Sequence, residues 1–183
     1  VLFAPAPYAA PAAYYFPMSI RLTGVEVFKG AASTRYGPQT VAGAVNVLTR
    51  SIPKQSQFNS ELSYGAFNTL KAHTYAGGVS KKGWGVLTEV AHLQSDGFKE
   101  LASGASTGFY RTEGMLKLSK QQFEIKLGYA TERSEETYLG LSTSDFANNP
   151  LLRHPASQEG LMKWYLSHSE ARWNTNISDN GDV

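Results

Sequence analysis

From about Gln57 onward, apolar and polar residues alternate with a period of two, the pattern of β-strands that bury one face. In the first run, at residues 57–64, Phe58, Leu62 and Tyr64 take even positions while polar residues take the odd ones. The alternation recurs in the runs at residues 68–79, 110–118, 123–129 and 165–177. A further run at residues 84–93 is ambiguous, because each of its faces mixes apolar with polar or charged residues. The sequence therefore predicts a mainly β fold.

The connections between these runs alternate in length. Lys81–Gly83 and Lys120–Gln121 are short, whereas the connections at residues 95–109 and 134–163 are long and rich in Gly, Ser, Asn and Pro. Short turns at one end of the strands and long loops at the other are typical of antiparallel transmembrane β-barrels of the outer-membrane type. A soluble β-sandwich, whose inner face also alternates with polar residues, is the alternative.

Aromatic and charged residues are distributed as such a barrel requires. Aromatic residues mark the ends of the runs, where the girdles at the two membrane interfaces would form: Tyr64, Trp84, Tyr110, Tyr129, Tyr165 and Trp173. We expect the charged residues of the runs to face the lumen, since facing lipid they would cost a few kcal/mol each: Glu61, Lys71, Glu113, Lys117, Glu124, Lys126, Glu170 and Arg172. A two-residue turn at Lys120–Gln121 would set Lys117 directly opposite Glu124.

Composition excludes several classes of function. The net charge is +2, from 17 basic and 15 acidic residues, which does not favour a nucleic-acid partner. Without cysteine, the chain has neither disulfides nor thiolate metal sites. The four histidines lack metal-ligand spacing, and the adjacent Glu135 and Glu136 are more typical of solvated loop charge than of a catalytic pair. We therefore expect neither an enzyme nor a bound metal or cofactor.

The first fifty residues have a different pattern of apolar, polar and small residues. Two short β-branched runs, Val25–Phe28 and Val45–Leu48, flank a small-residue segment with glycines at positions 30, 37 and 43. This pattern predicts two strands joined by a compact connection that contains glycines.

The ordered run from Val25 to Arg50 resembles the last part of the plug domain of TonB-dependent outer-membrane receptors. Three segments are most similar to the ferric-citrate-type receptors: Ala4–Tyr8, Phe16–Ser19 and Arg35–Gln39. The resemblance implies that residues 1–53 are the C-terminal part of a plug and residues 54–183 the N-terminal part of a transmembrane barrel. About six strands of an expected 22 would be present, so we interpret the chain as a fragment that is not transport-competent alone.

The resemblance also implies a function, the TonB-dependent active uptake of a ferric chelate across the bacterial outer membrane. The chelate would be ferric citrate or a similar siderophore, with iron present only in the cargo. The partners would be the TonB energy-transducing system and outer-membrane lipid. A receptor of the same architecture for another cargo, and a soluble β-rich binding or adhesion module, are the alternatives.

An anionic, oxygen-rich chelate needs guanidinium groups and amide donors. The resemblance implies substrate-binding candidates in the plug, Tyr8 and Gln39 on runs that match the apical loops and Arg35 beside Gln39. It also implies Arg133 and Arg153, which flank a segment similar to a ferric-citrate-type loop. The alternative for each arginine is an ion pair that anchors a loop. Lys29 and Arg50 are candidates for contacts between plug and barrel, or else are simply solvated.

Overall fold

The computed structural model describes residues 16–36, 43–101, 103–104, 107–137 and 139–174. The fold is mainly β, as the sequence predicts, and its strands form two antiparallel sheets. The chain divides into two compact units, with the division between Ser51 and Ile52; the sequence places it after residue 53. Among the described residues, no helix has the length and apolar character needed to cross a bilayer.

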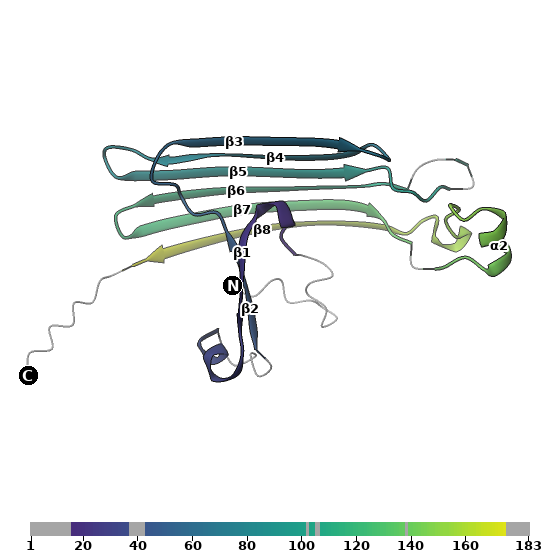
Figure 1. Ribbon diagram of the computed structural model, residues 1–183, viewed down its shortest axis with the longest axis horizontal. Helices are drawn as coiled ribbons and strands as arrows, with labels where there is room; N and C mark the ends of the chain where they lie inside the picture. Colours follow the sequence, from purple (N-terminus) through teal and green to yellow (C-terminus); the bar gives the residue numbers. More distant parts are fainter. Residues whose placement is uncertain (1–15, 37–42, 102, 105–106, 138, 175–183) are drawn as a thin grey trace, which may run out of the picture. The chain divides into compact units, whose positions relative to one another are not determined.

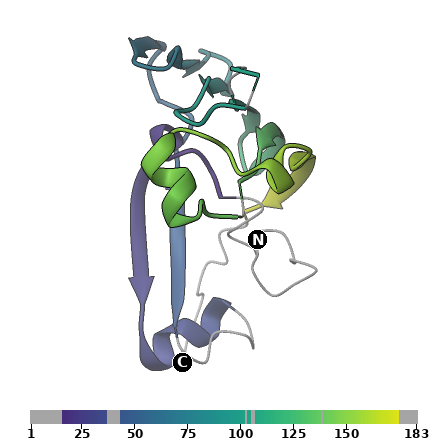
Figure 2. The same cartoon turned by 90° about the vertical axis from the view of Figure 1, so that its right-hand side faces the viewer.

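The first unit contains a two-stranded antiparallel sheet, and the two predicted strands are confirmed. Its elements are η1 (Ser19–Arg21), β1 (Leu22–Phe28), η2 (Gly30–Tyr36) and β2 (Ala44–Thr49). Figure 2 shows β1 and β2 side by side with η2 beyond one end of the pair. Gly43 directly precedes β2 with a φ of 133°, and a Cβ there would lie 2.8 Å from the Phe28 carbonyl oxygen. Glycine is therefore required at this close approach.

The second unit is one sheet in which six consecutive strands lie side by side in chain order (Figure 1). Every run of alternation found in the sequence is a strand, including the ambiguous run at 84–93. The strands are β3 (Gln57–Gly65), β4 (Thr69–Val79), β5 (Trp84–Ser95), β6 (Phe109–Lys120), β7 (Phe123–Glu135) and β8 (Leu161–Trp173). The predicted last run extends to Ile177, which lies outside the described residues.

The predicted asymmetry of the connections is also confirmed. The turns at residues 80–83 and 121–122 lie at one end of the strands, called here the turn end. The loops at residues 96–108 and 136–160, together with the short connection 66–68, lie at the other end, the loop end (Figure 1). The longest loop contains helix α2 (Thr143–Asn148), capped by the Ser142 side chain, and the short helix η3 (Pro155–Ser157).

The predicted position of the β6–β7 turn is wrong by one residue, and the cross-strand partners are therefore shifted by two. The turn residues are Gln121 and Gln122, so Lys117 lies directly opposite Lys126 and Glu124 lies opposite Ser119. Gln121 has a φ of 53°, the left-handed conformation that this kind of tight turn needs. Glycine or asparagine normally marks such a position, and its absence left the register undetermined by the sequence.

Strand register divides the sheet into two faces of different character. The charged face consists of the odd-numbered residues of β3 to β6 and the even-numbered residues of β7 and β8. All eight charged residues expected to share a face do so. The opposite residues form the low-charge face, which carries Asp, Glu, Lys or Arg at four strand-end positions of the described strands, Lys120, Arg133, Glu135 and Lys163.

The two faces also differ in burial. On β5, Leu87 and Ala91 of the charged face are fully buried, whereas Val86 and Val90 of the low-charge face are about half exposed, at 44% and 50%. The low-charge face presents many further exposed apolar side chains, including Phe58, Leu62, Leu118, Leu127, Tyr165 and Trp173. The pattern is the reverse of a soluble sheet that buries its apolar face.

Candidate binding site at the loop end of the sheet

The two long loops are joined to each other at the loop end of the sheet. Glu100 donates its backbone N–H to the Leu151 carbonyl at 2.8 Å, and Arg153 donates its own to the Glu100 carbonyl at 2.7 Å. Lys99 Nζ donates to the Pro150 carbonyl at 2.9 Å, and the Thr107 hydroxyl donates to the Lys99 carbonyl at 2.8 Å. The first three contacts hold loops 96–108 and 136–160 together, and the Thr107 contact lies within the first of these loops.

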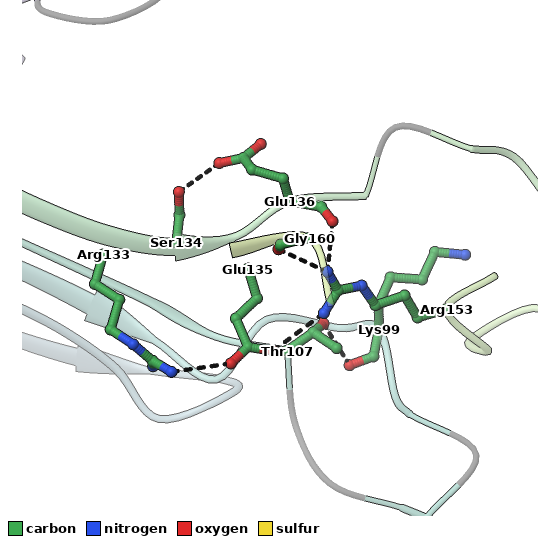
Figure 3. A network of polar contacts seen from close by, with 8 residues as sticks. All are labelled: Lys99, Thr107, Arg133, Ser134, Glu135, Glu136, Arg153 and Gly160. Atoms are coloured by element: carbon green, nitrogen blue, oxygen red, sulfur yellow. Dashed lines mark hydrogen bonds and ion pairs between the residues drawn. The ribbon is translucent and has the colours of Figure 1, made fainter. Parts of the chain in front are cut away.

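Arg153 is the centre of this joint (Figure 3). Its side chain is fully buried, and its Nη1 donates to Glu135 Oε2 at 3.1 Å. Its Nη2 donates to the carbonyls of Glu136 and Gly160, at 2.5 Å and 2.9 Å. The guanidinium therefore neutralises a strand-end carboxylate and satisfies two loop carbonyls. This geometry favours the loop-anchoring role over direct contact with a ligand.

Arg133, the second loop candidate, lies on β7 in a more open position. Its side chain is 39% exposed, and its Nη2 contacts the other oxygen of the same carboxylate, Glu135 Oε1, at 3.3 Å (Figure 3). Glu135 is thus shared between two arginines, one buried and one accessible to solvent.

Arg133 and Glu135 line a pocket of about 260 Å³ at the loop end. The other lining residues come from the ends of β5 and β6 and from the loop between them: Gln94, Ser95, Asp96, Gly108, Phe109 and Tyr110. Gln94, Tyr110 and Arg133 are successive partners across the strands, so they form one row on the low-charge face. The pocket offers guanidinium, amide and phenol groups, with Asp96 bonded to Asn68 at 2.6 Å.

The plug candidates cannot be compared with this site. Tyr8 and Gln39 lie outside the described residues, and only the backbone of Arg35, in η2, is described. Lys29 is exposed directly after β1, and Arg50 follows β2. Their predicted roles as contacts between plug and barrel stay predictions.

Sequence reasoning missed a buried ionic cluster on the charged face. Arg111 contacts Glu113 at 2.6 Å and Glu132 at 3.3 Å, and its guanidinium lies 5.2 Å from the centre of the Trp164 ring. On the neighbouring strands, His73 Nε2 lies 2.9 Å from Glu89 Oε1, with both side chains buried. Cross-strand register brings Arg111 to Glu132 and His73 to Glu89, and no single run of alternation reveals these two contacts. Among the described residues, no group of three or more His, Asp and Glu side chains is placed to hold a metal ion.

No protein-family model matches the sequence, and the search of solved structures returned no significant match.

Proposed function

We propose that the chain is part of a TonB-dependent receptor that takes up a ferric chelate across the bacterial outer membrane. In this proposal β1, η2 and β2 belong to the plug, and β3 to β8 belong to the wall of the barrel. Two independent features support it: the ordered run from Val25 to Arg50, and the division of the six-stranded sheet into two faces.

The low-charge face carries the proposal, because it has the height and composition of a lipid-facing surface. On β7, ten positions separate Phe123 at the turn end from Arg133 near the loop end. At about 3.4 Å per residue and a tilt of about 40°, these ten steps rise about 26 Å. The apolar band of outer-membrane barrels is about 25 Å tall. On β6, Lys120 and Tyr110 are separated by the same number of positions.

Aromatic residues of the low-charge face occupy the two borders of this band. Trp84, Phe123 and Trp173 lie at the turn end, and Lys120 Nζ lies 4.6 Å from the centre of the Trp84 ring. Tyr64 and Tyr110 lie at the loop end. Such aromatic and basic side chains are favourable where hydrocarbon meets headgroups.

The charged face then lines a polar lumen. Its carboxylates and cations are paired along and across strands, as Arg111 is with Glu113 on β6 and with Glu132 on β7. A soluble sandwich would bury the apolar face against a second sheet and expose the charged one. The structure has the opposite burial: Glu89 and Glu113 are buried while Leu62 and Tyr165 are more than two-thirds exposed.

The proposal changes the part assigned to the two loop arginines. Arg153 orders the joined loops, so it acts on chelate binding through their position. Arg133 belongs to the low-charge face and would lie on the outer wall of the barrel. Direct contact with the chelate remains proposed for the plug residues Tyr8, Arg35 and Gln39, and ferric citrate remains the proposed cargo from the resemblance of the plug segments.

The test of this function uses the complete receptor expected to contain this chain. We expect it to fractionate with outer membranes, to show heat-modifiable mobility in gels, and to support uptake of ferric citrate only in cells with TonB. A matched uptake assay with another ferric siderophore separates the cargo from the architecture. Recovery of the folded protein in the soluble fraction, without detergent, would contradict the proposal and favour the β-rich binding module.

The isolated chain supplies a second readout. Its sheet ends at β3 and β8, and both outer edges lack a strand partner among the described residues. Two unpaired edges and an exposed apolar face make it prone to aggregate in plain buffer. A monodisperse monomer with a cooperative thermal transition in plain buffer would contradict the membrane assignment.

A further inference from the structure

Two cations lie directly opposite each other on the low-charge face at the loop end. Arg133 of β7 is the register partner of Lys163 of β8, and the Lys163 side chain is exposed. Like charges in directly opposed positions on neighbouring strands repel each other. An anion bound between them would relieve this repulsion.

The carboxylates around this pair are already engaged. Among the low-charge-face residues opposite or diagonal to the pair, Glu135 alone is acidic, and it also contacts the fully buried Arg153. Two cations, Arg133 and Arg153, therefore already share this carboxylate. The comparable pair on the charged face is different, because Lys117 and Lys126 have Glu124 and Glu170 as opposite or diagonal neighbours.

The position of the pair limits which anion can reach it. Arg133 and Lys163 continue the apolar surface of Leu127, Tyr129 and Tyr165 toward the loop end. In the proposed barrel, this height is the border between lipid chains and headgroups on the side of the long loops. An anion attached to lipid chains would contact the cations and the apolar surface together, whereas a soluble anion would contact the cations alone.

We propose that Arg133 and Lys163 bind the phosphate groups of outer-leaflet lipid. Tyr110, the partner of Arg133 on β6, adds a phenol beside the cations. The guanidinium offers a planar fork suited to phosphate oxygens, and the lysine offers a second, flexible donor. This inference rests on the proposed function, since it requires the low-charge face to meet lipid.

The experiment compares variants of the complete receptor in phosphatidylcholine nanodiscs that contain either diphosphorylated lipid A or the same lipid after removal of its phosphates. Native mass spectrometry of the released protein counts the retained lipid A. We expect Arg133→Gln and Lys163→Gln each to weaken retention of the phosphorylated lipid about fivefold, since a basic side chain near an anionic membrane surface contributes about 1 kcal/mol. The double variant is expected to lose about 25-fold by the same reasoning.

Lys71→Gln is the matched control, because it removes an exposed cation from the charged face near the loop end. We expect it to retain lipid A as the unaltered receptor does, and we expect Arg133→Lys to retain most of the binding. Equal loss in Lys71→Gln, equal retention of both forms of lipid A, or displacement by inorganic phosphate would each overturn the inference. Heat-modifiable mobility, measured on every variant, shows separately whether the barrel itself is formed, and so separates this inference from the proposed function.

Discussion

Replacing Arg153 by alanine is expected to release the two long loops from each other while the strands stay folded. The substitution leaves Glu135 without its buried partner and removes the guanidinium donor from the carbonyls of Glu136 and Gly160. The Gly160 carbonyl keeps the Glu136 backbone N–H as a donor. Loss of one partner of a buried ionic contact costs about 3 kcal/mol or more. Hydrogen exchange should therefore show roughly a hundredfold loss of protection at two backbone amides: Glu136, which bonds to Gly160 within the longer loop, and Glu100, which bonds to Leu151 across the two loops.

The matched control is Arg133→Ala, which removes the other arginine on Glu135. Because the Arg133 side chain is 39% exposed, we expect its removal to change the opening free energy of the loops by less than about 1 kcal/mol. The affinity for ferric citrate should fall in Arg153→Ala and stay close to that of the unaltered receptor in Arg133→Ala. Equal effects of the two substitutions on exchange would contradict the role of Arg153 as the loop anchor.

A charge in the middle of the low-charge face is expected to destabilise the barrel strongly. Leu127 lies between the two borders of the band on β7, and its side chain is 43% exposed. Leu127→Arg should lower the free energy of unfolding in a bilayer by about 2–4 kcal/mol relative to Leu127→Ala, the range for arginine facing lipid near the midplane. Urea titration of the complete receptor in vesicles measures this difference.

Asn59→Arg is the control for adding a charge to an exposed strand position. Asn59 is the third residue of β3, on the charged face, and its side chain is exposed. In the proposed lumen, water solvates the added guanidinium, so we expect a change of less than about 1 kcal/mol. A larger loss for Asn59→Arg than for Leu127→Arg would mean that the two faces have been assigned the wrong way round.

Five of the six strands of the larger sheet could be predicted from the alternation of their side chains, because a period of two is a local property. Which residues of β5 lie on which face could not be predicted from the sequence. Glu89 and His73 are hidden together on the charged face, and His92 bonds to the Thr112 hydroxyl at 2.7 Å on the low-charge face. Each polar group has a hydrogen-bond partner on a neighbouring strand, and the sequence of one strand alone does not reveal that partner.

The same limit applies to the candidate site. An arginine in a loop sequence can bind a ligand or anchor the loop, and burial decides between these roles. The full burial of Arg153 follows from backbone carbonyls at Glu136 and Gly160 that converge only after folding. The outward placement of Arg133 follows from the length of β7, which extends to Glu135 and so beyond the run at residues 123–129 that the sequence predicts. Alternation along this longer strand puts Arg133 on the face opposite to Glu124 and Lys126.

The central claim is that the low-charge face of β3 to β8 meets lipid, and β3 offers the most direct test. Every residue of β3 is exposed, and this sequence has no cysteine, so single cysteines can be introduced for spin labelling with little steric conflict. The complete receptor, with any cysteine elsewhere replaced by serine, is labelled in vesicles at each position from 58 to 63. The measurement is collision of the label with oxygen, which concentrates in lipid, and with a polar nickel complex, which stays in water.

We predict an oscillation with a period of two residues. Labels at Phe58, Ser60 and Leu62 should collide mainly with oxygen, and labels at Asn59, Glu61 and Ser63 mainly with the nickel complex. Uniform access of the nickel complex at all six positions, or the opposite oscillation, would contradict the account.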